Sequence, residues 1–189
     1  MKSKSLLPWN EIKNRLQNKS NKELLKILSD CYKLNDEVKY HLSVIVIDNN
    51  EELDKVLQDL RSQMSLAFWA TKKSGEPLGP KLIDAKKIVI NVKKFTNDPN
   101  IILDFMMDYV EHGINFTCSY GDLWENYYMS IENMYHSVIQ MILKNKDTID
   151  VEKYLKRIDK MVAKTSGMGW GFHDTLTDYT DELKDALDL

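Results

Sequence analysis

Apolar side chains recur along most of this chain at intervals of three and four residues. The stretch 122–145 shows this most clearly, with apolar positions at Trp124, Tyr127, Tyr128, Ile131, Met134, Tyr135, Val138, Ile139 and Ile142. Because an α-helix repeats about every 3.6 residues, this spacing places the apolar side chains on one face and predicts a helix packed against a core. The stretches 50–72, 99–112 and 151–162 follow the same pattern.

Residues that disrupt helices fall between these periodic stretches. Glycine occurs at 75, 79, 113, 121, 167, 169 and 171, and proline at 8, 77, 80 and 99. None of them interrupts the stretches 9–74, 81–98 or 122–166. Inside a helix, proline costs about 3 kcal/mol and glycine about 1 kcal/mol, so a helical chain requires this placement.

Capping signals mark the ends of the expected helices. Ser20 with Glu23, and Asn49 with Glu52, have the spacing of a capping box, and Asp98 precedes a proline at the first helical position. His112 followed by Gly113 is typical of a helix end. These signals and the periodicity predict helices over residues 9–17, 20–34, 36–47, 50–73, 80–96, 99–112, 122–145, 150–165 and 173–188.

The predicted fold class is all-α, with about nine helices packed as antiparallel hairpins in a compact bundle or a short α-α superhelix. The β-branched runs at 44–47 and 88–90 could form short strands, but their flanks are helix-like and no hairpin turn adjoins either run. We expect a single domain over residues 1–189, with residues 1–8 disordered and a loop over 72–80.

Composition and charge narrow the class of protein further. The net charge of −3 gives nucleic acid no general attraction, so a nucleic-acid partner is not expected. No stretch approaches the roughly 18 apolar residues of a membrane span, and the N-terminal residues lack the apolar core of a signal peptide. Cys31 and Cys118 lie far apart in sequence and read as free thiols. We therefore expect a cytoplasmic location and no membrane partner.

The first stretch that could carry chemistry is GINFTCSYGD at 113–122, which leads into an aromatic helix. Hydroxyl groups and a carboxylate gather there before a helix N-terminus, whose free N–H groups can hold an anion. The candidate ligand-binding residues of this stretch and the helix after it are Tyr120, Asp122, Trp124 and Tyr128. The simpler interpretation is that Asp122 caps the helix while Phe116 and Tyr120 pack the loop down.

The second stretch is TSGMGWGFHD at 165–174, where glycines alternate with large apolar side chains. Its candidate ligand-binding residues are Trp170, His173 and Asp174. A neighbouring His–Asp pair could act in acid–base chemistry, although adjacent helical side chains point about 100° apart. The simpler interpretation is a glycine-rich connection whose tryptophan fills the core and whose Asp174 caps the next helix.

The sequence contains no motif for binding a metal or a cofactor. His41 and His136 have no second ligand at helical spacing, and the glycines match neither a phosphate loop nor a dinucleotide fingerprint. We expect no metal and no cofactor, and the sequence assigns no catalytic residue.

Charge is unevenly distributed between two expected helices. Lys86, Lys87, Lys93 and Lys94 share one sector of the helix 80–96 and form a candidate basic face. The last helix is acidic, with Asp174, Asp178, Asp181, Glu182, Asp185 and Asp188 against Lys184. Such runs are commonly solvated faces, and these two could also attract each other within one molecule or between copies.

The runs FTCSYGDLWENYYMSIENMY at 116–135 and TSGMGWGFHDTL at 165–176, with AKKIVINVKKF at 85–95 before them, resemble a family of small bacterial proteins of unknown function. The resemblance covers roughly residues 20–185. It implies a bacterial, cytosolic, all-helical domain and transfers no activity, cofactor or catalytic residue.

Three functional hypotheses follow from the sequence. The preferred one is a binding or interaction module for a protein partner, using the basic face with the stretches 113–122 and 167–174. The first alternative is a small-ligand-binding protein or enzyme, with a pocket lined by Trp124, Tyr128 and Trp170 between these two loops. The second is weak nucleic-acid binding through Lys86–Lys94. A homo-oligomer is also left open.

Overall fold

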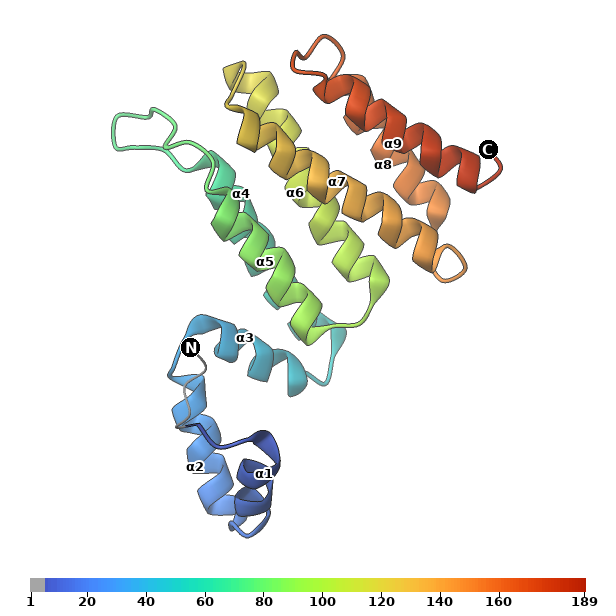
Figure 1. The fold of residues 1–189 in the computed structure, drawn as a ribbon. Helices are drawn as coiled ribbons and strands as arrows, with labels where there is room; N and C mark the ends of the chain where they lie inside the picture. The colour runs from blue at the N-terminus through green and yellow to red at the C-terminus, as the bar shows by residue number, and fades with distance from the viewer. Residues whose placement is uncertain (1–5) are drawn as a thin grey trace. The chain divides into compact units, whose positions relative to one another are not determined.

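The computed structural model describes residues 6–189, with the side chain of Phe95 left out. Nine helices and no strand form over these residues, as the sequence predicts (Figure 1). They are α1 (Trp9–Gln17), α2 (Asn21–Tyr32), α3 (Asp36–Ile45), α4 (Asn50–Trp69), α5 (Leu82–Phe95), α6 (Pro99–Tyr120), α7 (Glu125–Asn145), α8 (Val151–Lys164) and α9 (Phe172–Ala186). The all-α fold class is confirmed.

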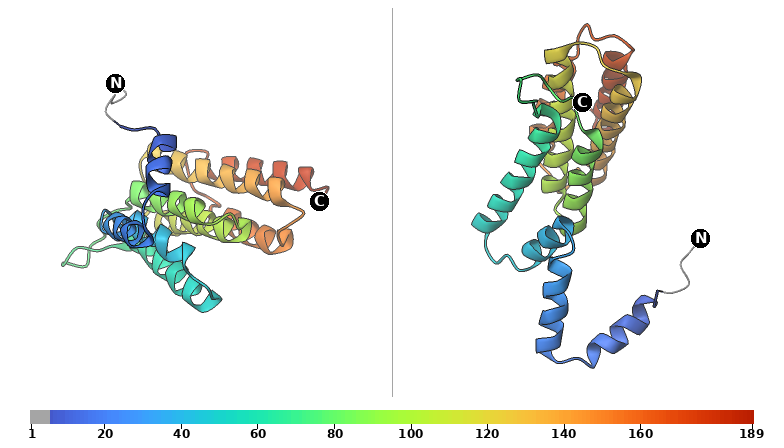
Figure 2. Two further views of the ribbon diagram at one scale, coloured as in Figure 1. Left: turned by 90° about the horizontal axis from the view of Figure 1, so that it is seen from below. Right: turned by 90° about the vertical axis from the view of Figure 1, so that its left-hand side faces the viewer.

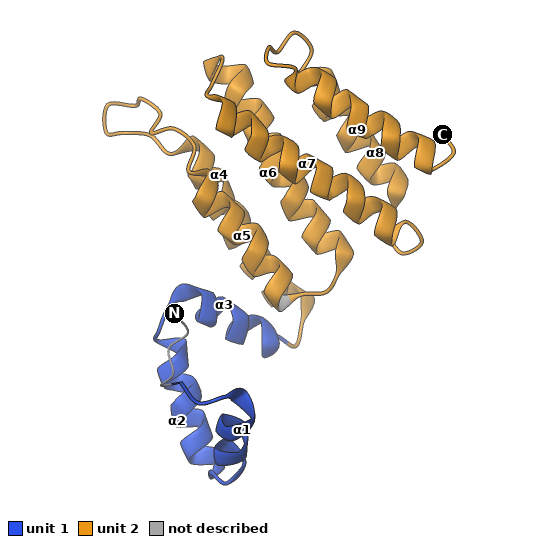
Figure 3. Ribbon diagram, in the orientation of Figure 1, with its two compact units in different colours: residues 1–47 blue, residues 48–189 orange. Residues whose placement is uncertain are grey.

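Contacts divide the chain into two compact units, residues 1–47 and residues 48–189 (Figure 3). The single domain expected over 1–189 stays a prediction. The disorder expected over residues 1–8 falls mainly on residues 1–5, which lie outside the described part of the chain. None of the helices that the structure describes is long and apolar enough to cross a membrane.

Over residues 6–47, unit 1 consists of three short helices without a buried core. The capping box at Ser20 and Glu23 forms as predicted at the start of α2, and Asn35 caps α3. No side chain of α1, α2 or α3 is buried. On α2, Leu25 is 67% exposed and Leu28 47%, although their spacing makes a continuous apolar face. Helices of this length gain little stability alone, so their apolar faces need a packing partner.

Unit 2 contains the hydrophobic core of the protein. Its six helices lie side by side as successive antiparallel hairpins, and Figure 2 shows the same helices from two further directions. Helix α6 is central, because it packs against α4, α5, α7 and α8. Its buried positions cover most of its circumference and include Leu103, Phe105, Met106, Met107, Tyr109, Val110, Ile114 and Phe116, while the half-buried Asp104, Asp108 and Glu111 occupy the remaining side. A helix with so broad an apolar surface is stable only among other helices.

The predicted end of this helix at Gly113 is wrong. Helix α6 continues through Gly113 to Tyr120, so most of the expected loop 113–122 is helical. Gly113 lies where α6 approaches α7: a Cβ added there would overlap Cδ1 of Ile131. The hydroxyl of Tyr127 also donates to the Gly113 carbonyl at 2.7 Å. The glycine therefore serves helix packing, and the chain leaves the helix at Gly121, whose φ is +83°.

Other predicted boundaries need smaller corrections. Helix α7 begins at Glu125 with Trp124 at its N-cap, so Asp122 does not cap it. Gly171 takes the N-cap position of α9, so Asp174 does not cap that helix. Helix α4 ends at Trp69, and the chain then forms the loop expected over 72–80, which holds one isolated bridge between Thr71 and Pro77. The runs 44–47 and 88–90 contain no strand, as predicted.

We expect Gly113→Ala to destabilise the protein by about 1–2 kcal/mol, because the added methyl group meets the buried side chain of Ile131 and overpacks the contact. This loss exceeds the usual gain from replacing glycine in a helix. Urea unfolding followed by circular dichroism measures it. Gly169→Ala is the matched control, since a Cβ there has nothing within 4 Å. An unchanged or higher stability of Gly113→Ala would contradict the close approach.

Candidate functional site

The two stretches singled out in the sequence meet at one end of unit 2. The connections α6–α7 and α8–α9 both lie at the upper end of this unit in Figure 1. The aromatic rings of Tyr128 and Phe172 are 5.0 Å apart, which joins the start of α7 to the start of α9. Lys164 at the end of α8 donates to Oδ1 of Asn115 on α6 at 2.8 Å. The ligand-binding hypothesis requires these segments to lie close together, and these contacts bring them together.

The hydroxyl of Tyr128 holds the α6–α7 connection through hydrogen bonds. Its side chain is only 3% exposed, and its hydroxyl accepts from the Leu123 backbone N–H at 3.3 Å. The same hydroxyl donates to Oδ1 of Asp122 at 3.4 Å and lies 3.2 Å from the hydroxyl of Thr117. These contacts hold Asp122 beside the end of α6. Tyr128 thus acts as a positioning residue, with its ring buried against Phe172.

His173 is held in a comparable way at the start of α9. Its Nδ1 lies 2.8 Å from Oγ1 of Thr165, a fully buried residue whose hydroxyl donates to the Val162 carbonyl at 2.8 Å. A threonine hydroxyl has a single proton, so His173 donates from Nδ1 to Oγ1 whenever that hydroxyl donates to Val162. Asp174 beside it is exposed. The acid–base role proposed for this pair stays a prediction.

Three large aromatic side chains remain exposed at this end of unit 2, and we call them the aromatic rim: Tyr120 is 49% exposed, Trp124 51% and Trp170 70%. Two of them contact a buried aromatic neighbour. Phe116 packs on Tyr120 with ring centroids 4.6 Å apart, and Tyr127 meets Trp124 at 5.6 Å. The prediction that Trp170 fills the core is wrong.

The exposed Trp170 has a left-handed backbone conformation. Its φ is +64°, and Gly171 after it has a φ of +69°. A left-handed conformation is uncommon for a residue other than glycine and costs free energy, so the fold must hold it there. The buried ring of Phe172, two residues later, provides the anchor. A strained, exposed tryptophan is a feature typical of binding sites.

A second aromatic group lies next to the rim and was not predicted from the sequence. Nε1 of Trp69 donates to Nδ1 of His112 at 2.9 Å, and His112 stacks on Phe68 at 5.6 Å. Burial lowers the pKa of His112, although the charges of Asp108 and Glu111 oppose this shift. The neutral imidazole is therefore an acceptor inside a continuous helix. The sequence analysis placed His112 at a helix end. Its role as a hydrogen-bond acceptor follows only once α6 is known to continue to Tyr120.

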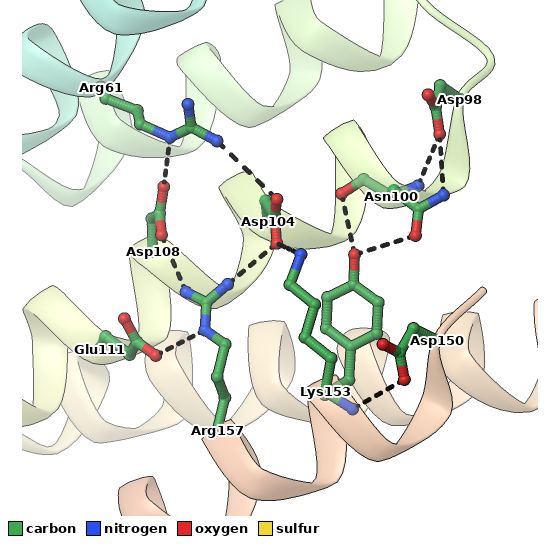
Figure 4. Close-up of polar contacts among 10 residues, drawn as sticks. Arg61, Asp98, Asn100, Asp104, Asp108, Glu111, Asp150, Lys153 and Arg157 are labelled. Carbon is green, nitrogen blue, oxygen red and sulfur yellow. Dashed lines mark hydrogen bonds and ion pairs between the residues drawn. The ribbon is translucent and has the colours of Figure 1, made fainter.

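Three carboxylates on successive turns of α6 converge on one arginine of α8 (Figure 4). Arg157 donates to Glu111 at 2.9 Å, to Asp104 at 3.0 Å and to Asp108 at 2.9 Å. Arg61 of α4 approaches the same group and donates to Asp108 at 3.2 Å. We call these residues the Arg157 network. Because the carboxylates are neutralised by guanidinium groups, the network joins α4, α6 and α8 and offers no free ligand set.

Burial acts against the charge on Arg157, yet its pKa is raised, because the carboxylates of Glu111 and Asp108 more than offset the desolvation. Across the part of the chain that is described, no group of three or more His, Cys, Asp or Glu side chains could hold a metal ion.

The candidate basic face lies on the exposed side of α5. Lys86, Lys87, Lys93 and Lys94 are all exposed, while Ala85, Ile88, Val89 and Val92 on the same helix are buried. Partial burial of the Lys93 side chain lowers the pKa of its ammonium group. The basic face and the aromatic rim come from different elements, so the sequence hypothesis that combined them into one surface stays untested.

Comparison of the chain with protein families, with characterised proteins and with solved structures yields no match.

We expect Arg157→Ala to lower the free energy of unfolding by about 2–3 kcal/mol, because it leaves three carboxylates of α6 close together without their shared cation. Urea unfolding measures this loss. Lys156→Ala removes only an exposed pair with Glu152 on the same helix and should leave the stability almost unchanged. Equal losses in the two variants would show that the Arg157 network contributes no more than a surface pair.

We expect the stability of the protein to fall as the pH decreases below about 6.5, with His112 contributing to the slope. Its pKa is lowered in the folded state, so the unfolded chain binds the proton first and the folded state loses stability in that window. His112→Gln keeps an acceptor for Trp69 without titrating and should flatten the dependence between about pH 7 and about pH 5. The exposed His41→Gln is the control. If His112→Gln retains the full slope, His112 is not the titrating group.

Proposed function

We propose that this protein is a binding module for a protein partner, and that it recognises a basic, partly apolar segment of that partner. The observation that carries the proposal is the position of the aromatic rim next to a line of carboxylates on α9. Trp170 lies just before this helix, which continues away from the rim along unit 2 (Figure 1).

The carboxylates form one face of α9. Asp174, Asp178, Asp181 and Asp185 follow one another at intervals of four, three and four residues, so they share one side of the helix. All four are exposed. The lysine of this helix, Lys184, is directed to Asp159 of α8 at 2.8 Å and does not neutralise the line. We call these four residues the aspartate stripe.

Together, the two features match a definite kind of ligand. Exposed tryptophan and tyrosine side chains that are held rigidly supply much of the binding energy in protein interfaces. Tryptophan and tyrosine faces also attract lysine and arginine cations. The aspartate stripe adds electrostatic attraction, which increases the rate of association and selects basic partners. Residues 48–189 as a whole carry 24 acidic and 17 basic side chains, which favours the same class of partner.

The alternatives find less support. The acidic excess of residues 48–189 opposes nucleic-acid binding through Lys86–Lys94. In the ligand-binding or enzyme hypothesis, Tyr128 and His173 would need free polar groups, yet both already position the chain. The setting that we propose is the cytosol of a bacterium, supported by two free cysteines and by the sequence resemblance described above.

The proposal can be tested with a fluorescein-labelled peptide that carries lysine and leucine at helical spacing, followed by fluorescence anisotropy. We expect saturable binding that weakens as salt is added, because the attraction is partly electrostatic. Trp170→Asn keeps a residue that tolerates the left-handed backbone and should weaken binding about tenfold. Asp178→Asn/Asp185→Asn should also weaken binding and reduce its salt dependence.

The matched control for charge is Asp54→Asn/Asp84→Asn, which removes the same number of exposed carboxylates from α4 and α5, away from the stripe. If both double variants weaken peptide binding equally, the loss of affinity comes from the change in net charge, and the proposed site is contradicted. Equal binding of a peptide with glutamate in place of lysine would also contradict it.

A further inference from the structure

A hollow of about 680 Å³ lies in unit 2, where the end of α5 and the start of α6 meet α7. This volume is within the range of roughly 300–1,000 Å³ found for small-molecule sites. Ile102 and Met141 supply apolar surface to it. Lys93, Lys144 and His136 bring positive or proton-donating groups, and neutral amides and a hydroxyl complete the lining.

The charge of this hollow is opposite to that of the surrounding protein. None of its lining residues is acidic, whereas acidic side chains outnumber basic ones over residues 48–189. Within the described residues, neither Lys93 nor Lys144 has a carboxylate at salt-bridge distance. The two cations therefore share a concave surface without a counter-ion from the protein.

Lys93 supplies an independent indication that a counter-ion is missing. Burial lowers the pKa of its ammonium group, and no neighbouring carboxylate opposes that shift. A partly desolvated cation without an opposite charge raises the free energy of the protein. An anion bound in the hollow would remove this cost.

His136 is held in place on the α7 side of the hollow. Its ring stacks on Tyr179 of α9 with centroids 4.7 Å apart, and the amide nitrogen of Gln140 lies 3.3 Å from its Nε2. These contacts support the imidazole at the edge of the hollow. A few well-placed polar groups give a small-molecule site its directionality.

We propose that this hollow binds a small organic anion, with the charged group between Lys93 and Lys144 and the apolar part against Ile102 and Met141. The site does not depend on the aromatic rim or on the aspartate stripe. Of the lysines on α5, Lys93 lines the hollow, whereas Lys86 and Lys87 lie outside it.

The proposal is tested by adding phenyl phosphate or benzoate to the ¹⁵N-labelled full-length protein and recording amide chemical shifts. We expect saturable shifts confined to residues 93–102 and 136–145, with a Kd on the order of 1 mM for at least one of the two probes. Benzyl alcohol lacks the charge and inorganic phosphate lacks the ring, so each should bind roughly tenfold more weakly.

Variants on α5 and α7 locate the charge. Lys93→Gln and Lys144→Gln should each weaken binding by roughly tenfold, whereas Lys86→Gln/Lys87→Gln should leave it unchanged. The spectra themselves show that each variant is folded. Absence of saturable shifts with both probes, shifts scattered over the lysine-rich surface, or equal weakening by Lys86→Gln/Lys87→Gln would overturn the proposal.

Discussion

The close packing of α6 against α7 is the contact on which unit 2 depends. Helix α6 lies among four other helices, and its buried side chains cover most of its surface. At Gly113 the two helices come so near that Ile131 occupies the space of a missing side chain, and the Tyr127 hydroxyl binds the α6 carbonyl there. Burial strongly raises the pKa of Tyr127, so the hydroxyl remains a neutral donor.

This contact also positions the candidate binding surface. Phe116 and Tyr120 lie on the last turns of α6, beyond Gly113, while Trp124 and Tyr128 lie at the start of α7. The direction of both helices is therefore set by the same crossing. Tyr128 then connects to Phe172, which anchors the turn that exposes Trp170. The aromatic rim is a consequence of how α6, α7 and α9 pack.

Most of the fold could be predicted from the sequence, because local signals agree with one another. The capping box at Ser20 and the proline after Asp98 were recognisable as helix starts, and both form. Gly113 was misread because a glycine serves two physical purposes, a left-handed helix end and a close approach between helices. The sequence near His112 resembles the first, whereas the second depends on Ile131, which is distant along the chain.

The candidate site was predictable only in part. The two stretches do meet, but exposure decides which residues can bind, and exposure depends on packing. Tyr128 and Trp170 are both aromatic, yet the first is buried and the second faces solvent. The aspartate stripe was visible in the spacing of α9. The hollow beside Lys93 was not, because it exists only once α5, α6 and α7 are assembled.

Hydrogen–deuterium exchange of the native protein tests the central role of α6 most directly. Amides that are deeply buried in a packed helix open only with the global unfolding of the unit. We therefore predict that the amides of residues 103–117 exchange among the slowest in the protein, with continuous protection through Gly113. Fast exchange that begins at Gly113 would restore the loop expected from the sequence and contradict this account.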